Sequence, residues 1–236
     1  IARACGKQNV HHLEREDLLP SRVRAHREPV FDVQLNDTET QLVTSSWDGT
    51  ARIIDVQSGM PMAYFDFQNA SAYAIQFSKN GLYIFTSQLD NTLRMWEIDT
   101  KKIVREFIGH SDVISAIVPD HTGKSIISCS WDGSLRIWDI ATGLMTQKLV
   151  GHRGAIYTAC LSKDGQAVFS GGADKTIRMW DITTGNVIKT FTGHQADVTS
   201  VLLSHDATML ISHSVDGVTK FWDLSSGKEF FEHILI

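Results

Sequence analysis

An aspartate recurs along this chain at a constant interval, and the residues around it recur with it. Consecutive copies, such as those at positions 48 and 90, lie 42 residues apart. Six residues after each aspartate stands Trp or an aliphatic residue, followed by an acidic residue. Periodicity on this scale is typical of repeat architectures, in which each unit buries its apolar face only against its neighbours. The aspartates are Asp48, Asp90, Asp132, Asp174 and Asp216, and the pairs that follow them are Ile54-Asp55, Trp96-Glu97, Trp138-Asp139, Trp180-Asp181 and Trp222-Asp223.

Four β-prone segments, separated by turn residues, make up the third copy, residues 109–150. Asp132-Gly133, between the second and the third segment, is a strong hairpin signal. Because four antiparallel strands cannot bury both faces of their sheet alone, each sheet must stack on its neighbours around an axis. The sequence therefore predicts an all-β fold, a β-propeller of four-stranded antiparallel blades. The expected strands of this copy, called a to d in chain order, are Val113–Val118, Lys124–Ser130, Leu135–Trp138 and Leu144–Val150.

These repeats resemble the WD40-repeat family over residues 26–236. Its GH dipeptides are matched by Gly109-His110, Gly151-His152 and Gly193-His194, and its WD dipeptides by Trp138-Asp139, Trp180-Asp181 and Trp222-Asp223. Two copies depart from the pattern: the first has Ala25-His26 and Ile54-Asp55, and the second has Phe67-Gln68 and Trp96-Glu97. The resemblance implies a propeller, and we expect five complete blades.

The predicted domain organisation is one propeller domain of five repeats, residues 26–236, preceded by a partial blade in residues 1–25. By the same register, residues 8–13 would be strand c of that partial blade and residues 19–25 its strand d. Five and a half blades do not close obviously, and propellers of this family most often have seven. We therefore predict an arc of a larger propeller. The alternative is a six-bladed closure in which the half blade borrows strands from another chain.

A hydroxyl residue stands four positions before each turn aspartate. With the GH histidines, these residues place Ser, His and Asp in three separate copies, a combination that also occurs in hydrolases. The resemblance implies instead a buried hydrogen-bonded chain from Asp through His and Ser to Trp. Buried polar groups cost about 2–7 kcal/mol when unpaired, which favours such a chain, and we find no Gly-x-Ser-x-Gly elbow. The expected structural sets are His110, Ser128, Asp132 and Trp138; His152, Ser170, Asp174 and Trp180; and His194, Ser212, Asp216 and Trp222.

Aromatic and aliphatic residues gather at the loops that this network joins, the b–c turn and the d–a loop before strand a. One group stands immediately before the turn aspartates, and the other stands five residues after the GH histidine register, a position that faces the same surface in WD40 proteins. Hydrophobic anchors within a polar rim are typical of protein interfaces. The alternative is that Phe31 and Tyr73 merely cap the sheet packing. The predicted partner-binding residues are Phe31, Trp47, Tyr73, Leu89, Trp131 and Tyr157.

Composition excludes several other functions. A net charge of −5 offers no attraction to a polyphosphate, so we expect no direct nucleic-acid binding. No apolar run is long enough to cross a membrane. His11-His12 has no matching ligand cluster and Ser170-Gly171-Gly172 is not followed by Gly-Lys-Ser/Thr, so neither a metal nor another cofactor is expected. Three cysteines without a framework and no visible secretory signal favour the cytoplasm, with the nucleus as the alternative.

The function predicted from these features is that of a non-catalytic scaffold, part of a larger chain or multiprotein complex. It would dock other proteins or peptides on the face that carries the b–c turns and d–a loops. A second hypothesis is the sensing or regulatory propeller portion of a larger multidomain enzyme. A third, a hydrolase, depends on Ser, His and Asp residues that recur with the blade period.

Overall fold

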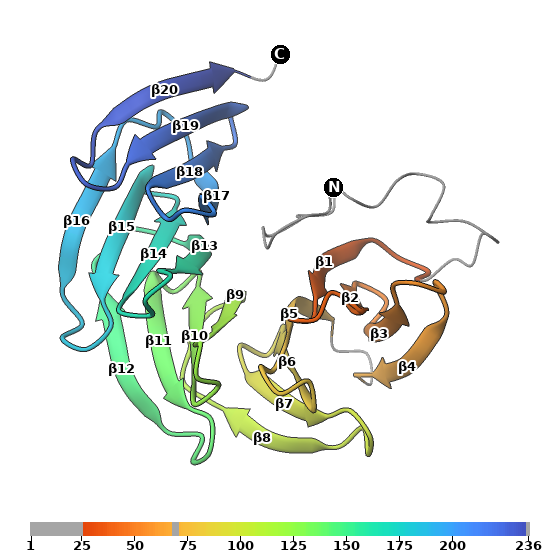
Figure 1. The fold of residues 1–236 in the computed structure, drawn as a ribbon. Helices are drawn as coiled ribbons and strands as arrows, with labels where there is room; N and C mark the ends of the chain where they lie inside the picture. The colour runs from red at the N-terminus through yellow and green to blue at the C-terminus, as the bar shows by residue number, and fades with distance from the viewer. Residues whose placement is uncertain (1–25, 68–70, 235–236) are drawn as a thin grey trace. The chain divides into compact units, whose positions relative to one another are not determined.

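The computed structural model describes residues 26–67 and 71–234, which form five four-stranded antiparallel sheets in the order of the repeats (Figure 1). This confirms the predicted all-β class and the four-stranded blades. The first sheet contains β1 (Val30–Leu35), β2 (Gln41–Ser46), β3 (Thr50–Asp55) and β4 (Pro61–Asp66). The second contains β5 (Ala72–Phe77), β6 (Tyr83–Gln88), β7 (Leu93–Glu97) and β8 (Ile103–Phe107).

The remaining three sheets repeat this order, and no helix that could span a membrane occurs in the part of the chain described. The third sheet contains β9 (Ile114–Pro119), β10 (Ser125–Ser130), β11 (Ser134–Asp139) and β12 (Met145–Val150). The fourth contains β13 (Ile156–Leu161), β14 (Ala167–Gly172), β15 (Thr176–Asp181) and β16 (Val187–Thr192). The fifth contains β17 (Val198–Leu203), β18 (Met209–Ser214), β19 (Val218–Asp223) and β20 (Glu229–Ile234).

Turn chemistry sets the limits of these strands. At the b–c turn, the residue after the aspartate has a positive φ in every sheet, and Gly occupies this position in three of the five. Asn91 and Lys175 occupy it in the other two, with φ of 65° and 64°. At the c–d turn, the carboxylate of the WD register accepts a hydrogen bond from a backbone N–H in four sheets, as Asp139 does from Thr142 at 2.7 Å, and Glu97 of the second sheet accepts from the Thr100 hydroxyl at 2.7 Å. In each repeat, an acidic residue of that repeat therefore stands in the b–c hairpin and another in the c–d hairpin.

The described chain forms two compact units, and the boundary between them falls between Ile108 and Gly109. In the first unit, Val43, Ile53 and Phe65 of the first sheet pack against Ile75, Ile84 and Trp96 of the second. The apolar core thus lies between neighbouring sheets, as a repeat that cannot bury its faces alone requires.

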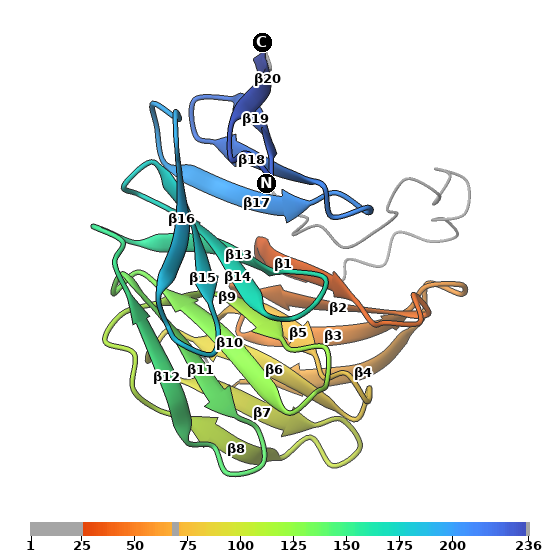
Figure 2. The ribbon, with the colours of Figure 1, turned by 60° about the vertical axis from the view of Figure 1, so that its left-hand side comes forward.

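The second unit stacks three sheets in the same way (Figure 2). Trp180 of the fourth sheet packs on the third, and Trp222 of the fifth packs on the fourth, where its ring meets Phe191 edge-on at 5.7 Å. Within each unit, the Trp of the WD register therefore packs its sheet on the preceding one, as Trp96, Trp180 and Trp222 do. The single propeller domain over 26–236 remains a prediction, and the partial blade in 1–25 lies outside the described residues.

Candidate functional site

A β-bulge near the start of strand a presents the candidate partner-binding aromatics. In the first sheet Val30 pairs with Ser46 and Asp32 pairs with Ser45, so Phe31 has no partner in the register. The same irregularity skips Tyr73 in the second sheet and Tyr157 in the fourth. A bulge places an extra residue in one strand and redirects its side chain. The residue five positions after the GH histidine position therefore stands outside the regular strand pairing in these sheets.

In the first unit, three of the predicted residues form one aromatic stack. The ring of Phe31 lies 5.3 Å from that of Trp47 and 5.2 Å from that of Tyr73. Trp47 is 59 % exposed, whereas Phe31 and Tyr73 are half-buried beneath it. Leu89, at the corresponding turn of the second sheet, is also exposed. The stack thus holds a rigid aromatic anchor partly in water.

In the second unit, Trp131 and Tyr157 form a perpendicular pair with ring centroids 6.4 Å apart. Trp131 is 37 % exposed, and Tyr157 donates a hydrogen bond from its hydroxyl to Asp197 Oδ2 at 3.2 Å. The structure therefore places the six predicted residues in two groups, one in each unit. That all six encircle a single face remains a prediction.

The polar residues of the third sheet form one continuous network. The ring of His110 contacts Asp132 through Nδ1 at 2.8 Å and Ser128 Oγ through Nε2 at 2.7 Å. Trp138 Nε1–H donates to the same Ser128 oxygen at 2.8 Å. The fourth sheet repeats this arrangement closely, with His152 Nδ1 on Asp174 at 2.9 Å, His152 Nε2 on Ser170 at 2.8 Å and Trp180 on Ser170 at 2.8 Å.

Electrostatics identify the proton positions in this network. Burial lowers the pKa of His110, which favours its neutral form. Burial opposes ionisation of Asp132, but hydrogen bonds from His110 and Ser134 outweigh it and hold the pKa of Asp132 well below its ordinary value. The ionised carboxylate accepts only, so Nδ1 of His110 carries the proton and Nε2 accepts from the serine hydroxyl. The serine is fully buried and committed to both neighbours, which leaves it unsuited to nucleophilic attack.

Two further side chains interact with the turn aspartate of the third and the fourth sheet, and neither was predicted from the sequence. A hydroxyl two residues later donates to the carboxylate, Ser134 to Asp132 at 2.6 Å and Thr176 to Asp174 at 2.7 Å. An arginine four residues later approaches the same carboxylate, with Arg136 at 3.9 Å and Arg178 at 3.7 Å. Both residue types recur with the 42-residue period in the first four copies, which is the signal that could have revealed them; the fifth copy has Val218 and Lys220 at these positions.

The first two sheets carry shorter networks, as their departures from the repeat pattern predict. In the first sheet, His26 contacts Asp48 at 3.2 Å and Thr44 at 2.7 Å. The hydrogen-bonded network stops at Thr44, because Ile54 occupies the position of the Trp and has no N–H to donate. In the second sheet Trp96 donates to Thr86 at 2.9 Å. Asp90 there is exposed and pairs with Arg94 at 2.7 Å.

The fifth sheet does not form the complete set expected for it. Ser212 contacts His194 Nε2 at 2.7 Å and Trp222 Nε1 at 2.8 Å. Asp216 instead accepts from the Ser214 hydroxyl, and Nδ1 of the buried His194 has no hydrogen-bond partner among the described residues. The physical reason is Val218, because it replaces the hydroxyl that orients the carboxylate in the other sheets.

Restoring that hydroxyl should complete the fifth network. We expect Val218→Thr to raise the free energy of unfolding by about 1 kcal/mol, because the introduced hydroxyl would turn Asp216 toward the buried Nδ1–H of His194. Urea denaturation of both proteins measures the change. The reverse substitution, Thr176→Val in the fourth sheet, is the matched control and should destabilise. A Val218→Thr protein no more stable than the parent would contradict this explanation.

The other chemical motifs do not form sites in the part of the chain described. No group of three or more His, Cys, Asp or Glu side chains that could hold a metal ion occurs there. Ser170, Gly171 and Gly172 are not a loop but the buried end of β14. A Cβ on Gly171 would lie 2.6 Å from Val198 of the next sheet, so this glycine permits close packing. The His11-His12 pair lies outside the described residues.

Comparison with known proteins identifies the same repeats. A family model described as WD domain, G-beta repeat, matches the chain five times, at residues 19–55, 61–97, 101–139, 143–181 and 185–223. Each match ends on the acidic residue of the register described above. No curated protein matches the chain.

Proposed function

Because this chain belongs to the WD40 family, whose repeats generally serve as protein-interaction scaffolds and are typically non-catalytic, we propose that it is a non-catalytic docking platform. Partner proteins or peptides would bind at the end of each unit that carries the b–c turns and d–a loops. The observation that supports this most strongly is the stack of Trp47, Phe31 and Tyr73, which holds a large aromatic side chain partly in water on a rigid base. Such anchors supply most of the energy of protein interfaces.

The buried serines support the non-catalytic assignment. The hydroxyl oxygens of Ser128, Ser170 and Ser212 each contact a histidine and accept from a tryptophan. These residues are at most 1 % exposed, so a substrate could not reach their hydroxyls. We also propose an intracellular location, in the cytoplasm or the nucleus, because the sequence has only three cysteines and no regular cysteine framework of the kind that small secreted domains use.

The test is partner capture with a double variant, Trp47→Ala/Trp131→Ala. Loss of an anchor of this kind costs about 2 kcal/mol or more, so captured partners should bind at least ~30-fold more weakly. The single variants assign each partner to one unit. Quantitative affinity measurement on each captured partner provides the readout.

A matched control removes exposed apolar side chains elsewhere. Met60→Ala/Phe230→Ala changes residues that are 63 % and 57 % exposed, one in a c–d turn and one on an outer strand. Partners should bind this control as they bind the parent. Equal binding to all three proteins, or equal loss from both double variants, would exclude the proposed face.

A further inference from the structure

A second feature of the b–c turn end of the second unit is a patch that combines aromatic rings with carboxylates. We call it the acidic–aromatic patch, and it consists of Trp131, Tyr157, Asp197, Val215 and Asp216. Trp131 meets Tyr157 edge-on, and the Tyr157 hydroxyl donates to Asp197 Oδ2 at 3.2 Å. The backbone N–H of Val215 donates to the carbonyl of Asp197 at 3.0 Å, which places the turn bearing Asp216 beside it. The five residues are therefore contiguous.

Asp216 differs from the other four turn aspartates because, among the described residues, it makes neither an ion pair with an arginine or lysine nor a hydrogen bond with a histidine. The corresponding arginine approaches the turn aspartate in the second, third and fourth sheets, at 2.7, 3.9 and 3.7 Å. In the fifth sheet the basic residue is Lys220, which pairs instead with Glu229 at 2.9 Å and Glu232 at 2.8 Å. Histidine contact is also lost there, as described above. Asp216 consequently presents an exposed and ionised carboxylate.

Asp197 adds a second carboxylate to the patch. It is half-buried, its side chain accepts from the Tyr157 hydroxyl, and no Lys, Arg or His of the described ranges lies within ion-pair distance of it. The adjacent Val215 is 68 % exposed and supplies apolar surface. Two carboxylates beside aromatic rings form the environment that a cationic side chain prefers, because the ring faces and the oxygens attract it together.

From this geometry we propose that the acidic–aromatic patch binds an arginine or lysine side chain of a docked protein segment. The proposal rests on the proposed docking function and specifies the chemistry of the partner. Two exposed cations, Arg153 in the d–a loop and Lys175 in the b–c turn of the fourth sheet, lie at the same end of the second unit as the patch. They would repel a uniformly basic segment, so the segment that fits carries an isolated basic residue among uncharged ones. A polyanion is disfavoured by the two carboxylates.

The test uses a short glycine–serine peptide with one central arginine as the probe, and the same peptide with glutamate as its counterpart. Binding is followed by NMR through the indole N–H signal of Trp131, which a Trp131→Phe variant assigns among the six tryptophans. The arginine peptide should shift this signal and the amide signals of residues 197 and 215–217. The glutamate peptide should shift none of them. Equal shifts from both peptides, or none from either, would overturn the proposal.

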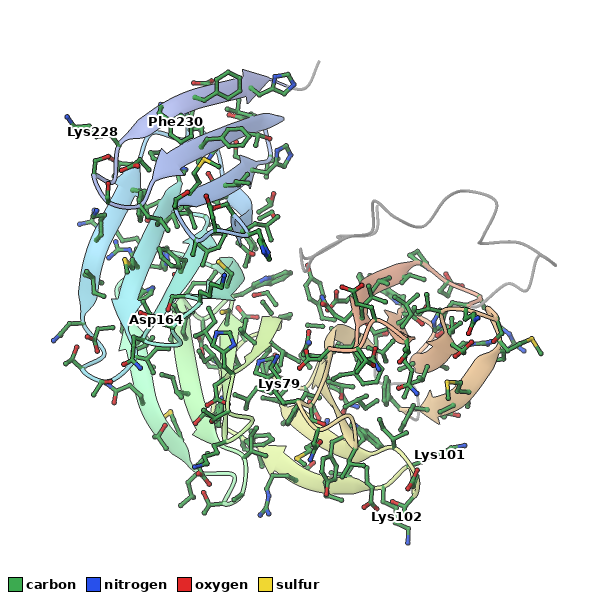
Figure 3. The ribbon with its side chains drawn as sticks, viewed as in Figure 1. Lys79, Lys101, Lys102, Asp164, Lys228 and Phe230 are labelled. Carbon is green, nitrogen blue, oxygen red and sulfur yellow. The ribbon has the colours of Figure 1, made fainter. Side chains whose placement is uncertain are left out.

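Charge removal supplies the second arm. Asp197→Asn/Asp216→Asn should bind the arginine peptide at least ~10-fold more weakly, since a charge-assisted hydrogen bond contributes about 1.5–3 kcal/mol. The matched control is Asp164→Asn/Asp206→Asn, which removes two charges from a–b turns at the other end of the same sheets (Figure 3 labels Asp164). The control should bind as the parent does. Unchanged affinity in the first variant, or equal loss in both, would contradict the proposal.

A structural variant keeps the test independent of folding defects. Val218→Thr should draw the Asp216 carboxylate toward His194 and weaken binding of the arginine peptide, while leaving the protein at least as stable as the parent. Unchanged binding by a stabilised Val218→Thr protein would count against the role of Asp216. If the peptide fails to bind while Trp131→Ala still loses a captured partner, the cation site is wrong and the docking function stands.

Discussion

Replacing Asp132 or Asp174 with alanine should lower the free energy of unfolding by about 2–3 kcal/mol, measured by urea denaturation. Each carboxylate accepts from a buried histidine and a hydroxyl, and the side chains of Asp132 and Asp174 are only 7 % and 8 % exposed. Alanine would leave the Nδ1–H of the histidine buried and unpaired. The loss should therefore exceed that of a simple surface substitution.

Two other turn aspartates are the controls for this prediction. Asp90→Ala removes an exposed carboxylate, and Arg94 keeps its ion pair with Glu106, so the cost should be about 1 kcal/mol or less. Asp216→Ala should also cost less than Asp132→Ala, because His194 does not contact that carboxylate. Equal losses in all four variants would show that the turn, and not the histidine network, stabilises the sheet.

The pH dependence of the same variants provides a further measurement. Because the pKa of Asp132 is depressed in the folded state, its contribution is fully present above the unfolded value of about 4 and is lost as pH falls through the folded pKa. The stability difference between the parent and Asp132→Ala should thus be constant near neutrality and narrow below about pH 4. A difference that grows in acid would contradict the assigned protonation states.

The sequence pattern was sufficient to predict the sheets because every repeat encodes the same hairpin. Asp132-Gly133 and its equivalents specify the b–c turn, and Trp96, Trp180 and Trp222 of the WD register pack their sheets on the preceding sheet of the same unit. These features are local or strictly periodic, so one repeat predicts the others. The exposed positions of Trp47 and Trp131 followed from the same register.

Details that depend on competition between similar hydrogen bonds were not predictable in the same way. The Asp216 carboxylate could accept a hydrogen bond from either His194 or Ser214. We attribute its pairing with Ser214 to the absence of a hydroxyl at position 218. The pairing of Lys220 with Glu229 and Glu232 requires the register of β19 with β20. The contact between Tyr157 and Asp197 joins two neighbouring sheets, and their packing is needed to place it.

The second large effect is expected at Gly171, on the buried face of β14 that contacts the fifth sheet. A Cβ at this position would lie 2.6 Å from Val198 Cγ1 and 2.9 Å from Val201 Cγ2, closer than side-chain carbons approach one another. We expect Gly171→Val to lower the free energy of unfolding by about 3 kcal/mol, because overpacking forces the two sheets apart. Urea denaturation and the tryptophan fluorescence of the folded state measure this effect.

Cys129 occupies the same register in the third sheet and provides the matched control. It is fully buried, but the fourth sheet already accommodates its side chain. Cys129→Val should therefore cost about 1 kcal/mol, since it adds only one heavy atom to a site that already holds a side chain, whereas Gly171→Val adds three. If Gly171→Val were no more costly than Cys129→Val, the fourth and fifth sheets would have to separate without loss of stability. The close approach at Gly171 is therefore expected to make this interface more sensitive to added volume than the one between the third and fourth sheets.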